Sequence, residues 1–572
     1  MAKSLFLTVA AALSLSACAA TQTAIAPASP PEQTAPEATG MVSAADPRAA
    51  EAGAQMLRQG GSATDAAIAT MLTLTVVEPQ SSGIGGGGFY VRSAPDGKVE
   101  TLDGRETAPG AAKPDWFLGA DGKPLPFGQA VGSGLSTGVP GNIALAAEAH
   151  RRHGKLKWAK LFEPAIRLAR DGWTLNSRTH RALSISADLA GRDPAGKAMF
   201  FDAQGKPLPV GTLIRNPALV DTLEKLAQQG PAAFYRGPDS EAMAVKIAED
   251  TPRSGGMTAT DLTSYQAKWR DPVCGKYRTF RICGMGPPSS GATTVLAILG
   301  QLEHLDMSQM RADSPVFWHV FAESQRLAYA DRDRFLADAD FISVPVARLI
   351  DPAYLARRGA TISLDKTLAT VGPGLELAPP AGEGPPEKGT SHFVAIDGAG
   401  SIVSYTSTIE GPFGSGLMFG GFYLNNELTD FSFTPEKDGQ LIANRVEGGK
   451  RPRSSMAPTI VYGADGKPVL AVGAAGGATI PVQVARAIIG YLDWGMSIDD
   501  ALALPVLFSP GDTVIVEKGT NLEALIPALK ALDHERVITA NLPLKANAIA
   551  ILPSGKLDGA ADPRSEGAAI GQ

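Results

Sequence analysis

Two threonines, Thr390 and Thr408, have the spacing expected of a nucleophile and a hydroxyl partner that orients it. Thr390 opens a strand-like run at 391–396, and Thr408 lies near the end of a second β-rich run at 401–409. A hairpin centred on Ala399 places the two threonines directly opposite each other. Opposed residues have Cβ atoms roughly 4.5–5.5 Å apart, so we expect a Thr–Thr hydrogen bond, although a one-residue bulge would shift the pairing.

A threonine hydroxyl becomes a good nucleophile only when a nearby base takes its proton, and a free α-amine on the same residue can serve as that base. The reference pKa of an α-amine, near 8, suits this role. Because an internal threonine has no free amine, the chain must first break between Gly389 and Thr390. Gly389 offers little bulk against that attack. On these residues alone, a threonine at the start of an ordinary strand is the simpler interpretation.

Motifs spread over the rest of the chain change that interpretation. They are 51–54 (EAGA), 77–83 (VEPQSSG), 103–109 (DGRETAP), 138–141 (GVPG), 287–291 (PPSSG), 389–393 (GTSHF), 424–427 (LNNE) with Asp430 and Phe431, 453–456 (RSSM) and 473–477 (GAAGG). In these residues and in their order, from about Gly40 to the C-terminus, the sequence resembles the γ-glutamyltransferase (γ-glutamyl transpeptidase) family of N-terminal nucleophile hydrolases.

The resemblance implies a fold and a domain organisation. The expected fold is a mixed α/β (α+β) four-layer αββα sandwich, whose two sheets take strands from both sides of the cleavage point. The expected products of self-cleavage are a large subunit, 41–389, and a small catalytic subunit, 390–572, which stay together as a heterodimer. Periodicity by itself indicates only a mixed α/β protein.

The resemblance also implies an activity, that of a γ-glutamyltransferase with glutathione hydrolase activity. Thr390, oriented by Thr408, would attack the γ-glutamyl amide of glutathione or a related compound. Water, or an amino acid or peptide acceptor, would then resolve the γ-glutamyl ester. No metal and no organic cofactor are implied.

Arg105 is the candidate for binding the substrate α-carboxylate, because a guanidinium can bind a carboxylate through two parallel hydrogen bonds. The resemblance assigns it this role, whereas an isolated arginine would more simply form a salt bridge with Asp103 or Glu106. Glu427 and Asp430 match family positions that bind the substrate α-amine. A polar turn would explain both equally well without the other motifs.

Five further positions complete the candidate site by resemblance. Ser454 and Ser455 would donate to the substrate carboxylate. The backbone N–H groups of Gly476 and Gly477 would form an oxyanion hole, although a tight glycine turn is the simpler interpretation of those two residues alone. Glu410 departs from one well-known family pattern, which has Asn there, and it could reach the substrate amine.

Two other patterns near these motifs are not assigned chemistry. His392 shares a strand face with Thr390 but is two residues away, roughly 6.6–7 Å along the strand, so we interpret it as structural. The segment 83–88 satisfies GxGxxG, but a strand-like run follows it where a dinucleotide site needs a helix. We expect close backbone packing at these glycines.

Several elements must position these residues. A capping box at 62–65 opens an Ala-rich helix from Ala66. Amphipathic helices are expected at 161–169, 219–228 and 317–335. The composition, 44% hydrophobic with a net charge of −6 over 572 residues, is that of a globular enzyme and gives no basic surface for nucleic acid.

The N-terminus has the features of a targeting segment. The pattern of residues 1–17 indicates a signal peptide. Residues 15–18 resemble a bacterial lipobox, which would leave a lipidated Cys18 as the membrane anchor. A plain secretory signal is the alternative. Residues 18–40 would form a disordered tether, which predicts a periplasmic, cell-envelope protein.

The two remaining cysteines, Cys274 and Cys283, would lie opposite each other if a two-residue loop forms at 278–279. An oxidising periplasm would permit a disulfide between them, and two small buried apolar residues are the alternative. The segment 434–450 is long enough to be a lid, but a disordered loop has the same sequence features.

Two other functions fit parts of the sequence. A glutaryl or cephalosporin acylase of the same superfamily would use the same nucleophile but would not need an anchor for an α-amine. A non-catalytic envelope lipoprotein that binds γ-glutamyl compounds would not cleave itself.

Overall fold

The computed structural model describes residues 39–376, Pro379 and 389–572. The signal peptide expected at 1–17, Cys18 and all but the last two residues of the tether expected at 18–40 lie outside this range. None of the helices within the described residues is both long and apolar enough to cross a bilayer.

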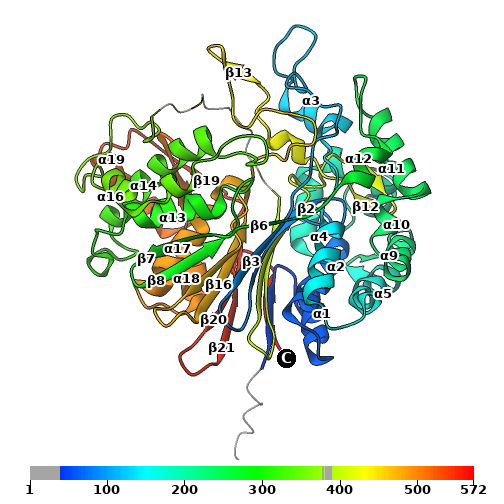
Figure 1. Ribbon diagram of the computed structural model, residues 1–572, viewed down its shortest axis with the longest axis horizontal. Helices are drawn as coiled ribbons and strands as arrows, with labels where there is room; N and C mark the ends of the chain where they lie inside the picture. Colours follow the sequence, from blue (N-terminus) through cyan, green and yellow to red (C-terminus); the bar gives the residue numbers. More distant parts are fainter. Residues whose placement is uncertain (1–38, 377–378, 380–388) are drawn as a thin grey trace, which may run out of the picture. The chain divides into compact units, whose positions relative to one another are not determined.

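Two antiparallel sheets form the centre of the protein (Figure 1). The seven-stranded sheet has the order β22-β1-β9-β10-β2-β3-β6. Its strands are β1 (Met41–Ala44), β2 (Gly87–Ser93), β3 (Val99–Gly104), β6 (Lys268–Arg270), β9 (Ser391–Ile396), β10 (Ile402–Thr408) and β22 (Ala568–Gly571). The six-stranded sheet has the order β21-β20-β16-β15-β8-β7. Its strands are β7 (Val273–Tyr277), β8 (Phe280–Gly284), β15 (Thr459–Tyr462), β16 (Pro468–Ala475), β20 (Lys545–Ile551) and β21 (Leu557–Ala561).

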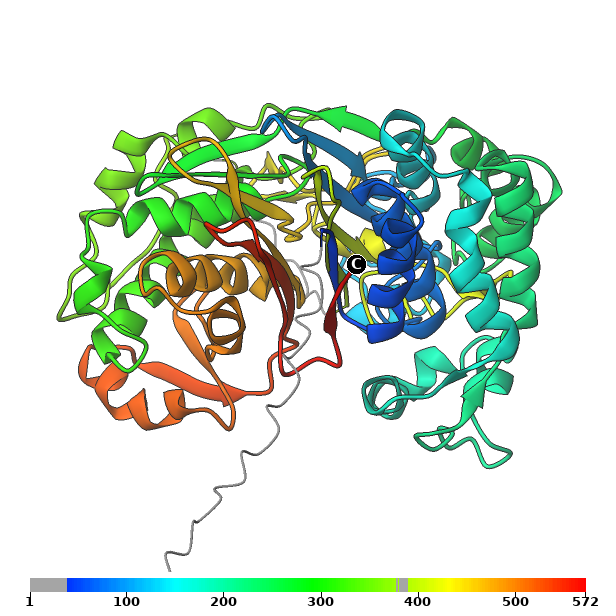
Figure 2. The ribbon, with the colours of Figure 1, turned by 90° about the horizontal axis from the view of Figure 1, so that it is seen from below.

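Helices cover the outer face of each sheet (Figures 1 and 2). The seven-stranded sheet is covered by α1 (Pro47–Arg58), α2 (Ala63–Val77), α4 (Asn142–His153), α5 (Glu163–Asp171) and α9 (Pro217–Gln229). The six-stranded sheet is covered by α13 (Gly291–Gln301), α14 (Pro315–Phe335), α16 (Pro352–Gly359), α17 (Ile480–Leu492) and α18 (Ile498–Ala503). Both sheets contain strands from before and after Thr390. The expected αββα sandwich is therefore confirmed.

Further helices and strands complete the fold. They are α3 (Phe127–Val131), α6 (Ser177–Ile185), α7 (Ala187–Ala190), α8 (Pro194–Phe200), α10 (Ala232–Tyr235), α11 (Pro238–Glu249), α12 (Ala259–Ser264), α15 (Val346–Leu349), α19 (Ile526–Ala531), β4 (Trp173–Thr174), β5 (Leu213–Ile214), β11 (Met418–Phe419), β12 (Phe422–Tyr423), β13 (Glu436–Lys437), β14 (Gln440–Leu441), β17 (Leu507–Phe508), β18 (Thr513–Glu517) and β19 (Arg536–Ala540). The strands β13 and β14 form a small hairpin within the segment 434–450.

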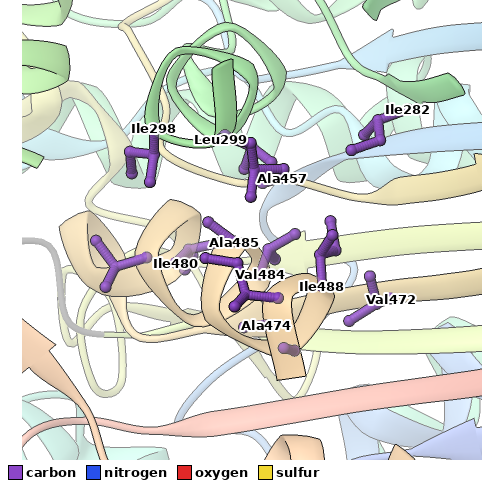
Figure 3. Packing of buried hydrophobic residues seen from close by; sticks show 14 of the residues in the cluster. Ile282, Ile298, Leu299, Ala457, Val472, Ala474, Ile480, Val484, Ala485 and Ile488 are labelled. Atoms are coloured by element: carbon purple, nitrogen blue, oxygen red, sulfur yellow. The ribbon is translucent and has the colours of Figure 1, made fainter. Parts of the chain in front are cut away.

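Apolar side chains fix the layers against one another. Figure 3 shows Ile298 and Leu299 of α13 facing α17, whose Val484, Ala485 and Ile488 are buried. Because α17 is buried on nearly all sides, its sequence is mostly apolar, and its two polar residues, Gln483 and Arg486, are buried and hydrogen-bonded. Each fully buried Val, Leu or Ile contributes roughly 1.5–3 kcal/mol, so this packing holds β16 and the residues that follow it firmly in place.

The expected helices form, with boundaries that local chemistry explains. The capping box is confirmed, but α2 begins at Ala63 rather than Ala66, because Ser62 is the N-cap and Asp65 is already inside the first turn. The helix expected at 317–335 begins two residues earlier, at Pro315, since proline is favoured in the first turn. The helices expected at 161–169 and 219–228 are α5 and α9.

Both predicted hairpin registers are confirmed. In the β9–β10 hairpin, Ser391 pairs with Ser407, which is the register centred on Ala399. In the β7–β8 hairpin, Cys274 pairs with Cys283, and the two form a disulfide.

Candidate active site

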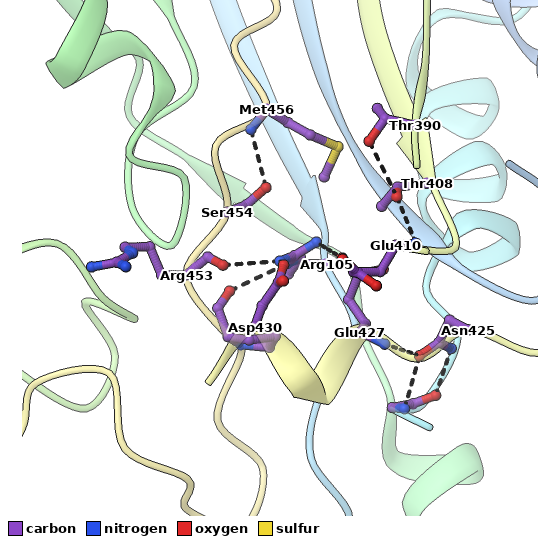
Figure 4. Close-up of polar contacts among 12 residues, drawn as sticks. Arg105, Thr390, Thr408, Glu410, Asn425, Glu427, Asp430, Arg453, Ser454 and Met456 are labelled. Carbon is purple, nitrogen blue, oxygen red and sulfur yellow. Dashed lines mark hydrogen bonds and ion pairs between the residues drawn. The ribbon is translucent and has the colours of Figure 1, made fainter. Parts of the chain in front are cut away.

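The candidate nucleophile, Thr390, lies immediately before β9, at the end of the sheet where Thr408 ends β10. The Thr390 Oγ1 lies 3.4 Å from Thr408 Oγ1 (Figure 4) and also contacts the carbonyl oxygen of Gly389. The backbone N–H of Glu410 donates to Thr408 Oγ1 at 2.7 Å. The Thr408 hydroxyl is therefore fixed from one side and faces the candidate nucleophile with its other side.

Glycines allow the backbone to pack closely around this pair. A Cβ atom on Gly389 would lie closer than 3.0 Å to the Glu410 carbonyl oxygen, and one on Gly86 would meet the Thr408 carbonyl in the same way. The segment 83–88 leads into β2, and no helix follows it. The expectation of close backbone packing is confirmed, and the dinucleotide motif is excluded.

Arg105 follows β3 directly and is the centre of a buried ionic cluster with a side chain only 1% exposed. One terminal nitrogen of its guanidinium pairs with Glu427, and the other pairs with Asp430 (Figure 4). The side chain also donates to the carbonyls of Pro452, at 3.2 Å, and Arg453, at 2.9 Å. The guanidinium pairs with two acids distant in sequence, which the simpler expectation of a salt bridge with Asp103 or Glu106 did not include.

A further acid, Glu106, lies beside this cluster, and its place in the site was not predicted from the sequence. Its two carboxylate oxygens and Oε2 of Glu427 accept no hydrogen bond within the described residues. Burial raises the pKa of Glu106 to about 7 and holds the pKa of Glu427 well above its usual range. Glu106 also disfavours ionisation of Glu427, which adds to the effect of burial on the Glu427 pKa. The adjacent Arg105 was the only available sequence signal.

The backbone of Glu410 adopts a left-handed conformation, with φ of 71°. This is uncommon for a residue other than glycine, and such conformations often occur at functional sites. The Glu410 carboxylate accepts from Asn426 Nδ2, and the neighbouring Gly411 N–H donates to Asn426 Oδ1 at 2.8 Å. Asn426 thus ties the turn after Thr408 to the turn that carries Glu427.

The neighbouring Asn425 holds the candidate amine-binding turn to other motifs. Its Oδ1 accepts from the N–H groups of Gly138, at 2.9 Å, and Glu427, at 3.1 Å. Its Nδ2 donates to the carbonyls of Gly85, at 2.8 Å, and Gly138, at 2.9 Å. A role for Asn425 and Asn426 as the support of Glu427 was not inferred from the sequence, where only Glu427 and Asp430 of this segment were assigned a role.

Ser454 and Ser455 follow the two carbonyls that bind Arg105. The Ser454 hydroxyl accepts from the N–H of Met456 at 3.2 Å (Figure 4), which leaves its proton available to a ligand. The Ser455 hydroxyl accepts from the guanidinium of Arg332. Both serines are buried beside the Arg105 cluster.

Gly476 and Gly477 follow the last residue of β16 and have φ of 129° and 59°. Both values lie in the region that favours glycine. Ala475, immediately before them, pairs with Lys545 of β20, and Lys545 contacts Ser391. The two glycines therefore lie at the same end of the sandwich as Thr390.

His392 is fully buried between the sheets, where its ring packs against Gly473 and its Nδ1 lies 2.8 Å from Thr406 Oγ1. Burial lowers the pKa of His392 to about 3, so the ring is neutral. These contacts agree with the structural role expected for it. Within the residues that the structure describes, no cluster of His, Cys, Asp and Glu could hold a metal ion.

Comparison with known proteins identifies the family. The model of the family described as gamma-glutamyltranspeptidase matches residues 49–572. The glutathione hydrolase proenzyme of Bacillus subtilis (strain 168) is 35% identical, over 93% of this chain and 91% of that protein. The acylase ACY 1 proenzyme of Pseudomonas sp. (strain SE83) is 33% identical, over 93% of each chain. The cephalosporin acylase structure from Bacillus halodurans has a TM-score of 0.81 and 26% identity, over 95% of this chain and 98% of that one. The chain therefore belongs to the gamma-glutamyltranspeptidase family.

Proposed function

We propose that this protein is a γ-glutamyltransferase and glutathione hydrolase made as a precursor that cuts itself between Gly389 and Thr390. The observation that carries the proposal is the Thr390 hydroxyl, which lies against the Gly389 carbonyl and 3.4 Å from the Thr408 hydroxyl. The hydroxyl oxygen attacks the carbonyl carbon, the peptide C–N bond breaks, and its nitrogen takes up the proton. Water then hydrolyses the resulting ester, which gives a large subunit ending at Gly389 and a small subunit, 390–572.

The free amine of Thr390 is then the base for turnover. Thr390 attacks the γ-amide of glutathione, cysteinylglycine leaves with a proton, and a γ-glutamyl ester remains on Thr390. The N–H groups of Gly476 and Gly477 would stabilise the oxyanion; losing one such donor typically costs about 10²–10³-fold in rate. Water completes hydrolysis, and an amino acid or peptide amine completes transfer.

The buried cluster of Arg105, Glu427 and Asp430 fits a γ-glutamyl group because that group carries both an α-carboxylate and an α-ammonium. The carboxylate would pair with Arg105, and the ammonium with the two acids. Ser454 and Ser455 would add hydrogen bonds to the carboxylate. The substrate then replaces ion pairs that the protein makes with itself, so little unpaired charge is buried before binding.

An acylase that acts on glutaryl side chains is the second candidate, because relatives of similar identity and a similar solved structure carry acylase names. The buried acids Glu427 and Asp430 favour a γ-glutamyl substrate, since a glutaryl group has no ammonium that could pair with them. The non-catalytic binding protein is disfavoured by family membership.

The discriminating experiment compares two donors on the same variants. Asp430→Ala should lower kcat/KM for γ-glutamyl-p-nitroanilide by about 100-fold, the value of one buried charge-assisted contact, and should spare glutaryl-p-nitroanilide. Asp438→Ala, which removes an acid from the β13–β14 turn, is the control. Equal losses with both donors would contradict the assignment of the amine site.

We also propose that the protein is held in the cell envelope through a lipid on Cys18. The apolar segment ending at 15–18 supports this, and so does the Cys274–Cys283 disulfide, which is typical of oxidising compartments. Cys18→Ser should release the protein into the soluble periplasmic fraction. Membrane association that survives this substitution would contradict the anchor.

A further inference from the structure

Three buried side chains outside the proposed chemistry meet directly behind the nucleophile. They are Glu78 at the end of α2, Ser391 at the start of β9 and Lys545 at the start of β20. Ser391 Oγ donates to Glu78 Oε2 at 2.6 Å. Lys545 Nζ donates to the same carboxylate oxygen at 2.8 Å and to Ser391 Oγ at 3.0 Å. The side chains of Glu78 and Lys545 are each 1% exposed, so each group depends on the others for its hydrogen bonds.

This network connects the three parts of the proposed catalytic site. Ser391 follows the nucleophile in the chain. Lys545 pairs with Ala475, the residue before the two glycines of the proposed oxyanion hole. The Glu78 carbonyl accepts from Ser81 N–H at 2.9 Å, and the Ser81 carbonyl accepts from the N–H of Ile409, next to Thr408. After cleavage, Glu78 would belong to the large subunit, and Ser391 and Lys545 to the small one.

Two cations balance the carboxylate of the network. Burial opposes ionisation of Glu78, but Lys545 and Arg178, whose Nε lies 3.9 Å from Glu78 Oε1, hold the Glu78 pKa below its usual value. Burial lowers the pKa of Lys545 to about 8, against the attraction of Glu78 and the more distant Asp46. At neutral pH, one carboxylate therefore lies between two cations.

The α-amine of Thr390 would form close to this charge. Standard bond lengths and the 3.0 Å contact between Lys545 Nζ and Ser391 Oγ keep the ammonium within about 10 Å of the Thr390 nitrogen. A positive charge at this distance, taken alone, lowers the pKa of a second ammonium by up to about one unit, and Lys545 thereby offsets the opposite effect of the Glu78 carboxylate. Chain ends also fray unless they are held, and cleavage turns Thr390 into a chain end.

We propose that Glu78, Ser391 and Lys545 are positioning residues that hold the newly formed N-terminus of the small subunit beside the oxyanion glycines, and that the Lys545 ammonium keeps the Thr390 amine in its free-base form. This inference rests on the self-cleavage and turnover proposed above. Through Ser391, the network fixes the residue next to the nucleophile without touching the substrate.

The test measures self-cleavage by intact mass, and kcat and KM for γ-glutamyl-p-nitroanilide as functions of pH. Ser391→Ala leaves the Glu78–Lys545 ion pair in place and should lower kcat about 10- to 100-fold with KM unchanged, because the Arg105 cluster is not altered. Ser391→Thr keeps the hydroxyl and should retain most of kcat. Ser43→Ala is the matched control, since Ser43 is also a buried strand serine with a hydrogen-bonded hydroxyl, but it donates to the backbone carbonyl of Ala560 rather than to a carboxylate.

The pH profile separates this role from a purely structural one. The acid limb of the kcat profile, where kcat falls as the pH is lowered, should report protonation of the Thr390 amine. Lys545→Met removes a positive charge and should move this limb to higher pH by up to about one unit. Glu78→Gln should move the limb to lower pH. The double variant leaves no unpaired buried charge, so it should fold, and it should combine a nearly normal acid limb with a low kcat.

This inference would be overturned, with the proposed function left intact, if Ser391→Ala kept the wild-type kcat. It would also be overturned if Lys545→Met and Glu78→Gln did not shift the acid limb of kcat in opposite directions. If either single charge variant fails to fold, Ser391→Ala and the double variant decide the question. A wild-type chain that neither cleaves nor turns over γ-glutamyl-p-nitroanilide would instead refute the proposed function itself.

Discussion

The nucleophile pair and the substrate-binding cluster are neighbours built in opposite ways. Thr390 and Thr408 are neutral hydroxyls 3.4 Å apart and 18 residues apart in sequence, within one hairpin. Arg105 is a buried charge whose partners, Glu427 and Asp430, are 322 and 325 residues away. The register of one hairpin assembles the first pair, whereas the complete fold is needed to assemble the second.

The two sites should therefore respond differently to mutation. Removing a hydroxyl from the nucleophile pair leaves no buried charge without a partner, so the main loss should be in rate. Removing one charge from the Arg105 cluster leaves its partners buried and unpaired, so stability and substrate binding should fall together. Three substitutions, taken from the largest expected effect to the smallest, test this separation.

Arg105→Ala should have the largest effect. Glu427 and Asp430 lose their counter-charge, and breaking a buried pair in this way typically costs about 3–5 kcal/mol of unfolding free energy. KM for a γ-glutamyl donor should rise at least about 100-fold because the α-carboxylate loses its partner. Urea unfolding and steady-state kinetics measure the two effects. A variant with lower affinity but wild-type stability would break the proposed link between them.

Thr408→Val should change the rate more than the stability. It keeps the shape of the side chain and removes the hydroxyl that faces Thr390. Self-cleavage and kcat should fall about 10- to 100-fold, while the lost hydrogen bond from the Glu410 N–H should cost only about 1–3 kcal/mol. Thr408→Ser should recover most of the rate. A large rise in KM with kcat unchanged would place Thr408 in substrate binding instead.

Glu106→Gln should have the smallest effect, visible mainly as a change in pH dependence. The Glu106 pKa is raised to about 7, so the carboxyl is neutral below that pH and charged above it. In the wild type, KM should fall a few-fold as pH rises through about 7, because the added negative charge favours the substrate ammonium. Glu106→Gln should flatten this trend. An unchanged slope would show that Glu106 does not titrate within the site.

The sequence alone could predict the features of the fold that depend on local turn and strand patterns. The β9–β10 register followed from the turn at 397–400, and the Cys274–Cys283 pairing from the two-residue loop at 278–279. The motifs identified Arg105, Glu427 and Asp430 as candidate site residues, but their ion pairs depend on the three-dimensional fold. The raised pKa of Glu106 depends on burial, and the left-handed backbone of Glu410 accompanies contacts with Asn426; periodicity reveals neither.

The most direct test of the central claim is intact-mass and N-terminal sequencing of the purified wild type beside Thr390→Ala. We expect two wild-type fragments, the smaller beginning at Thr390, and a single uncleaved chain in the variant. A folded wild type that stays in one piece, or a Thr390→Ala chain cut at the same bond, would contradict the claim that Thr390 generates itself as the catalytic nucleophile.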